Sequence, residues 1–214
     1  MVVDLAGTEG VAYIENDMEL RDLVGTPGER AVRKQLPALD PHARAYIAAS
    51  PFALLATSGA NGAGDVSPRG DGPGFVLVLD DRTLAIPDRP GNRRLDSYRN
   101  ILQNPGVGLI FLVPGMEETL RINGRARLVR EAPWMAEMVV QGKRPTLAVL
   151  VEVDEVYFHC AKAFRRSRLW DPETWPERGT LPTLGQMLRD QLKLEQTTTD
   201  LDCALEEAYQ KTLY

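Results

Sequence analysis

Short segments with β-strand character follow one another closely in the middle of the chain, and this arrangement most restricts its fold. The first, Phe52–Thr57, is an apolar run bounded by Pro51 and by a Gly-rich turn. Further segments of this kind occupy residues 65–67, 75–79, 83–86, 107–113, 120–129 and 147–156. Because strands joined by short turns pair with their neighbours, we expect an antiparallel sheet that closes into a small barrel.

Helix signals do not alternate regularly with these segments. Asp40 and Pro41 are typical of a helix start, and this helix ends near Ala49 because Ser50 precedes a proline. Other helices are expected over residues 93–103, 132–141 and 183–194, with helical pieces such as 16–23 and a short helix toward residue 214. Strands and helices in this order predict the α+β class.

The composition limits the functions that the chain can have. With 214 residues, 43% of them hydrophobic, the chain is long enough for one ordinary domain with a buried core. Its net charge of −5 argues against nucleic-acid binding. The two cysteines, Cys160 and Cys203, are too few for a disulfide scaffold or a thiolate metal site, and no apolar run approaches a membrane span. We therefore expect a cytoplasmic protein that binds neither metal nor membrane.

Positive charge is distributed unevenly along the chain. Only five of the 25 basic residues are lysines, and arginines gather at residues 89–94, 121–125 and 165–168. The planar guanidinium group of arginine binds phosphate oxygens in pairs, whereas lysine acts as a point charge. A genome biased toward arginine explains the number of arginines equally well, but it explains their clustering less easily.

The first arginine cluster lies between a predicted strand and a predicted helix. Gly91 allows close backbone approach, and Asn92 with the first helical N–H groups can face an anion. With Arg93 and Arg94 beside them, we interpret this corner as a phosphate site. The alternative is that Asn92 only caps the helix while both arginines are solvated. The patterns of a nucleoside-triphosphate P-loop and of a dinucleotide fold are absent from this segment.

Other candidate features are less specific. Residues 66–74, which include Ser67 and Arg69, are rich in Gly and Pro and are interpreted either as a loop that approaches a ligand or as a wide turn. His159 and Cys160 lack a third partner for a nucleophilic triad or a metal site. No pair of acid and base side chains stands out, so the catalytic residues are unassigned, and an enzyme of this kind would depend on a cofactor.

An ordered series of motifs extends from about Pro41 to Trp170. It comprises Ser50–Phe52, Leu55–Thr57, Asp65–Asp71, Pro73–Phe75, Leu84–Arg94, Asn104–Pro105, Phe111 and Leu120–Ala126. The series resembles the pyridoxamine 5'-phosphate oxidase-like flavoproteins. This resemblance implies a split β-barrel homodimer that holds FMN in clefts between its subunits. The FMN-binding barrel would occupy residues 41–170. Residues 1–40, which mix charge with Gly and Pro, are interpreted as an N-terminal lead-in with helical pieces, and residues 171–214 are expected to form a helical extension packed on the barrel.

The resemblance also implies which residues bind the cofactor. The strand end at Ile86 runs beside the flavin ring, the first arginine cluster surrounds the phosphate, and the segment before Trp170 closes a flavin site, across the dimer in one arrangement. The complete implied set is Ser67, Arg69, Ile86, Pro87, Asp88, Asn92, Arg93, Arg94, Thr119, Arg165, Arg166, Ser167 and Trp170.

The function implied by the resemblance is that of an FMN-dependent oxidoreductase acting on an unidentified small molecule. The chain after Trp170 does not match the substrate-binding Arg and His pattern of the vitamin-metabolising members, so no substrate is assigned. Two alternatives stay open: a reductase that uses the deazaflavin F420, and a non-enzymatic protein that binds flavin or haem.

Overall fold

A computed structural model describes residues 10–214 of the chain, which divide into two compact units, residues 10–35 and residues 36–214. The first unit contains helices α1 (Asp17–Val24) and α2 (Glu29–Arg33), neither of which buries a residue. Helix α1 confirms the helical piece predicted at residues 16–23. It begins where the Asn16 side chain accepts a hydrogen bond of 2.9 Å from the Glu19 backbone N–H.

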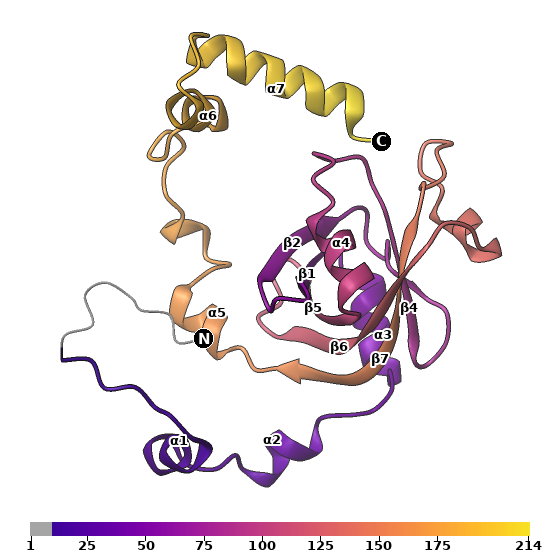
Figure 1. The fold of residues 1–214 in the computed structure, drawn as a ribbon, viewed down its shortest axis with the longest axis vertical. Helices are drawn as coiled ribbons and strands as arrows, with labels where there is room; N and C mark the ends of the chain where they lie inside the picture. The colour runs from indigo at the N-terminus through magenta and orange to yellow at the C-terminus, as the bar shows by residue number, and fades with distance from the viewer. Residues whose placement is uncertain (1–9) are drawn as a thin grey trace. The chain divides into compact units, whose positions relative to one another are not determined.

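The second unit is built on a sheet of seven strands in the order β2-β1-β5-β6-β7-β4-β3, with every neighbouring pair antiparallel. The strands are β1 (Phe52–Ser58), β2 (Gly64–Gly70), β3 (Leu77–Val78), β4 (Thr83–Pro87), β5 (Gly106–Leu112), β6 (Thr119–Val129) and β7 (Ala148–His159). They curve around a common interior (Figure 1). The predicted α+β class and antiparallel sheet are confirmed.

The main core lies inside this curved sheet. Leu55, Phe111, Leu120 and Ile122 are fully buried there and pack with Ile47 of helix α3 (Pro41–Ala49). Along β1 and β5, buried residues alternate with half-buried or exposed ones. Each strand therefore turns one face to the core and the other outward, as the two-residue period of a strand requires.

Helices complete the second unit. They are α3, α4 (Asp96–Gln103), α5 (Lys162–Ser167), α6 (Leu184–Leu192) and α7 (Thr198–Thr212), with 3-10 turns at Pro133–Met138 and Pro172–Thr174. Helix α3 begins as predicted, since the Asp40 carboxylate accepts a 2.7 Å hydrogen bond from the Ala43 N–H. Helix α4 packs against β1, β2 and β6. No helix within residues 10–214 combines the length and apolar character needed to span a bilayer.

Three predicted elements differ from the structure, and one observed helix was not predicted. Residues 66–70 are not a loop, because β2 continues through Pro68; β2 is an edge strand, where a missing N–H donor is tolerated. The helix predicted over 93–103 begins three residues later, because Arg93 and Leu95 have left-handed backbone conformations. The helix predicted over 132–141 is a 3-10 turn, and α5 lies at Lys162–Ser167, where the sequence signals predict no helix.

Candidate functional site

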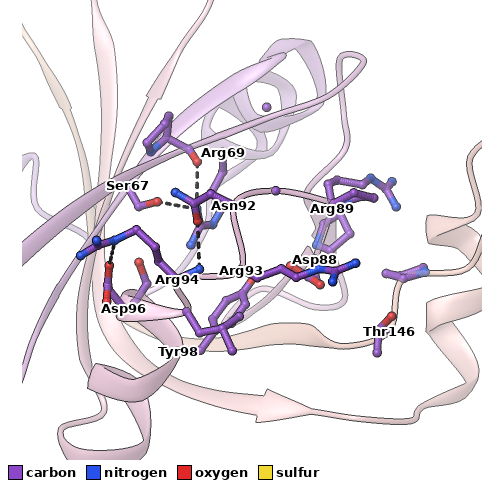
Figure 2. A pocket seen from close by; sticks show the side chains of 18 of the residues that line it. Ser67, Arg69, Asp88, Arg89, Asn92, Arg93, Arg94, Asp96, Tyr98 and Thr146 are labelled. Carbon is purple, nitrogen blue, oxygen red and sulfur yellow. Dashed lines mark hydrogen bonds and ion pairs between the residues drawn. The ribbon is translucent and has the colours of Figure 1, made fainter. Parts of the chain in front are cut away.

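A cleft of about 1190 Å³ opens in the second unit beside the N-terminal end of α4. One wall is strand β2 from Asp65 to Gly70, the next is the segment 87–98, and residues 143–146 form the opposite side. In the view of Figure 2, Asn92 and Arg93 lie between Ser67 and Thr146. Phe75 and, from the far end of the chain, Thr212 and Tyr214 also line it, so the fold assembles the cleft from segments that are distant in sequence.

Arg69 occupies the β2 wall of the cleft. One terminal nitrogen of its guanidinium donates to the Ser67 hydroxyl at 2.6 Å and to the Pro68 carbonyl at 2.9 Å. The guanidinium carbon lies 5.6 Å from the centre of the Tyr98 ring, within the range of a cation–π contact. Its Nε is buried and has no hydrogen-bond partner among the described residues. A buried unpaired donor is costly, so this side chain favours an additional acceptor nearby.

The loop before α4 carries the remaining residues of the first arginine cluster. The Asn92 side-chain oxygen accepts a 3.0 Å hydrogen bond from the Arg94 N–H, which holds the turn. The Arg94 guanidinium pairs with Asp96 at 2.7 Å in an exposed position. Arg93 takes part in no ion pair within residues 10–214 and lines the cleft. Its guanidinium is therefore available to an anionic ligand.

Tyr98 joins helix α4 to the loop. Its hydroxyl donates a 2.6 Å hydrogen bond to Asp88. Burial, together with the hydrogen bond to Asp88 and its negative charge, raises the pKa of Tyr98. The hydroxyl therefore stays protonated and acts as a donor. A second link runs from Ser97 to Asp65 at 2.8 Å, so α4 and β2 keep a fixed spacing at the cleft.

Arg89 has a different role from its neighbours in the cluster. Its Nε lies 2.5 Å from the Asp71 carboxylate, and a terminal nitrogen donates to the Met138 carbonyl at 3.0 Å. The Asp71 side chain is only 6% exposed. Burial opposes its ionisation, but hydrogen bonds from Tyr214 and Gly72 and the charge of Arg89 outweigh burial and lower the pKa of Asp71. Arg89 therefore serves the structure beside the cleft.

The structure brings together part of the set implied by the resemblance. The residues of that set that line the cleft are Ser67, Arg69, Pro87, Asp88, Asn92, Arg93 and Arg94. Ile86 is buried in the core, and Thr119 is buried at the start of β6. Arg165 and Trp170 line a second, shallower cavity of about 540 Å³, and neither Arg166 nor Ser167 lines the cleft.

The residues on the opposite side of the cleft were not predicted from the sequence. Lys143, Arg144 and Thr146 line it, as does Tyr214. The adjacent pair Lys143-Arg144 was a usable signal, since it is a further basic group in an acidic chain. Tyr214 had no local signal, because it meets Asp71 from 143 positions away.

The family model described as pyridoxamine 5'-phosphate oxidase matches residues 39–160, more than half of the chain. The chain belongs to the pyridoxamine 5'-phosphate oxidase family. The matched region contains the whole seven-stranded sheet and most of the cleft. It confirms the family predicted from the motif series. No curated protein matches the chain.

Several solved structures are similar to the family region. A candidate pyridoxamine 5'-phosphate oxidase from Lactobacillus delbrueckii is 22% identical, with a TM-score of 0.46, and the match covers 58% of this chain and 98% of that one. HupZ from Group A Streptococcus is 18% identical, with a TM-score of 0.45 and coverages of 55% and 91%. An FMN-binding protein from Syntrophomonas wolfei is 12% identical, with a TM-score of 0.44 and coverages of 55% and 83%.

Proposed function

We propose that the chain is an FMN-binding flavoprotein whose cofactor phosphate is held in the cleft by Arg69 and the loop at residues 92–94. The observation that carries the proposal is the Arg69 guanidinium, which lines the cleft while its buried Nε lacks a partner among the described residues. A phosphate group is the acceptor that an arginine matches best.

The charges around the cleft fit a phosphorylated ligand. Arg93 is not engaged in an ion pair within the described part of the chain, and Lys143 and Arg144 add positive charge on the opposite side. Ser67 and Asn92 provide polar side chains beside them. Although the chain as a whole carries a charge of −5, the basic side chains that line the cleft outnumber its acidic ones, Asp65, Asp88 and Asp96.

The bound FMN would supply hydride or electron transfer, and the protein would bind and orient it. In this assignment Ser67, Arg69, Asn92, Arg93 and Arg94 hold the phosphate, while Pro87 and Asp88 lie beside the ring. The proposed activity is oxidation or reduction of a small molecule.

We further propose that two copies of the chain form a homodimer that covers the cleft. Phe52 and Leu54 of β1 lie opposite Leu112 and Ile110 of β5, and all four are apolar residues on the outer, incompletely buried positions of their strands. This outer face continues into β2 through Val66, which is 64% exposed and lines the cleft. A second copy on this face would shield apolar surface and the cofactor together.

The first test identifies the small molecule released when the purified protein is denatured by heat. The expected result is FMN by mass and by its oxidised-flavin absorbance. Release of F420, which absorbs at shorter wavelength, would contradict FMN as the cofactor but would still agree with a phosphate-binding cleft. Release of haem would contradict both the cofactor and the phosphate-binding role of the cleft.

The second test is a titration of the flavin-free protein with FMN. Arg93→Ala is expected to weaken binding by about 1.5–3 kcal/mol, because it removes a charge-assisted hydrogen bond. Arg130→Ala is the matched control, since Arg130 is an exposed arginine that does not line the cleft. Equal affinities for Arg93→Ala and the control would contradict the assignment.

A further inference from the structure

Tyr214, which follows helix α7, lines the cleft. Its hydroxyl donates a 2.7 Å hydrogen bond to Oδ1 of Asp71, and its backbone oxygen accepts a hydrogen bond from the Lys143 ammonium group. Both Tyr214 and Lys143 line the cleft. One residue is thus held at two ends, through a hydroxyl and through a carbonyl-type oxygen.

The groups that hold Tyr214 are suited to recognise a ligand. Asp71 is buried, and its other oxygen is occupied by Arg89, so its carboxylate is fixed in position. Asp71 Oδ1 also accepts a 2.7 Å hydrogen bond from the Gly72 N–H, which fixes the direction of its acceptor. An oriented carboxylate accepts a strong hydrogen bond from a hydroxyl group, and a lysine ammonium group donates to a carboxylate or carbonyl oxygen.

Helix α7, which leads to Tyr214, provides no buried side chain to anchor it. None of its residues is buried, and its exposed apolar side chains include Tyr209, at 53%. The two polar contacts of Tyr214 are of a kind that a ligand with the same groups can replace. The cleft also has room, since its volume of about 1190 Å³ exceeds the range of about 300–1,000 Å³ common for small-molecule pockets.

We infer that Tyr214 is a displaceable occupant of a ligand subsite, in which Asp71 binds a phenolic hydroxyl and Lys143 binds a carboxylate. The ligand class is therefore a hydroxylated aromatic acid. The inference deepens the proposed function, because the subsite shares its cleft with the proposed FMN site. Binding at the subsite is nevertheless measurable whether or not flavin is present.

The probe for the test is 3-(4-hydroxyphenyl)propionate. This compound has a phenol ring and a carboxylate. The same two-carbon linker separates them as separates the phenol ring from the backbone carbonyl in tyrosine. Its affinity is measured by isothermal titration calorimetry on the purified full chain. Tyr214→Ala removes the phenol from Asp71 but keeps the backbone oxygen beside Lys143, whose ammonium group has three donors and can bind the probe as well. This variant is expected to bind the probe at least about tenfold more tightly than the original chain, because an occupied subsite lowers apparent affinity by the fraction that is open. Tyr214→Phe, which removes only the hydroxyl, is expected to give an intermediate gain.

Two controls test the specificity of the subsite. Tyr209→Ala removes an exposed tyrosine from the same helix and is expected to leave the affinity unchanged. In Tyr214→Ala, 3-phenylpropionate is expected to bind at least about tenfold more weakly than the hydroxylated probe, because it leaves the Asp71 acceptor unpaired. Equal affinity of Tyr214→Ala and the original chain, absence of binding in both, or equal binding of the two acids would each overturn the inference. None of these results depends on the FMN titration.

Discussion

At the scale of single residues, neighbours in one arginine cluster have separate tasks. Arg89 is paired with a buried carboxylate, while Arg93 lines the cleft without an ion pair among the described residues. The difference comes from Asp71, which the fold places against Arg89 from 18 positions away. A buried carboxylate is stable only when it is paired and hydrogen-bonded, so Arg89 is not available to a ligand.

The Asp71 pair makes the stability of the fold depend on pH. The pKa of Asp71 is lowered below its ordinary value of 3.8, because the hydrogen bonds and the Arg89 charge outweigh burial. The folded state therefore binds this proton less readily than the unfolded state. The resulting stabilisation is fully present above pH 3.8 and is lost as the pH falls through the lower folded-state pKa.

This pH dependence is tested by urea unfolding of the original chain and of Asp71→Asn at neutral pH and at acid pH. The difference in unfolding free energy between the two proteins is expected to be largest near pH 7 and to shrink below pH 3.8. A difference that stays constant or grows on acidification would show that the Asp71 charge does not contribute as described.

At the scale of the elements, one glycine allows the bulge in the longest strand pair, β6 and β7. The register between β6 and β7 shifts at Asn123/Gly124, which forms a bulge. A Cβ atom at Gly124 would collide with the backbone carbonyl oxygen of Glu152. Because the colliding atom belongs to the backbone and not to the end of a flexible side chain, it cannot move away cheaply, so the bulge requires glycine at this position.

Gly124→Ala is therefore expected to lower the free energy of unfolding by about 1–3 kcal/mol, the usual cost of forcing an added group into a packed site. Denaturant unfolding followed by circular dichroism measures the change. Gly64→Ala is the control, because a Cβ atom there has no neighbour within 4 Å and its φ is not left-handed. Similar losses in the two variants would mean that the bulge tolerates a side chain.

The same scale shows what could be predicted from the sequence. Strand β1 and helix α3 were predictable because their signals are local, namely an apolar run and an Asp-Pro start. The continuation of β2 through Pro68 was not, because only the place of the strand at the sheet edge makes proline acceptable there. The late start of α4 depends on left-handed residues, Arg93 and Leu95, that composition does not reveal.

The candidate site follows the same division. The motif around Arg93 was visible in the sequence, because a cluster of arginines and a glycine are adjacent. Tyr98 and Tyr214 were not identified, since their contacts with Asp88 and Asp71 arise only from folding. The far side of the cleft was therefore the least predictable part of the site.

At the scale of the whole molecule, the proposed dimer and the proposed cofactor are linked. Most of the implied flavin-binding residues line the cleft, while Arg165 and Trp170 line the second cavity, and Ile86, Thr119, Arg166 and Ser167 line neither. If a partner subunit supplies the second group to the first, each cleft is complete only in the dimer. Binding of FMN and association of subunits then favour each other, because a ligand that prefers the dimer stabilises it.

The expected outcome is an apparent FMN affinity that rises with protein concentration over the range where light scattering shows monomer becoming dimer. Phe52→Glu places a charge on the outer face of β1, where Phe52 is 37% exposed. We expect this variant to be monomeric and to bind FMN more weakly, because a charge buried at an interface is strongly disfavoured. Leu192→Glu is the matched control, since Leu192 on α6 is 62% exposed. If Phe52→Glu is monomeric and still binds FMN as tightly as the original chain, then FMN binding does not depend on the dimer. The cleft would then be complete within one subunit, and the proposed link would be wrong.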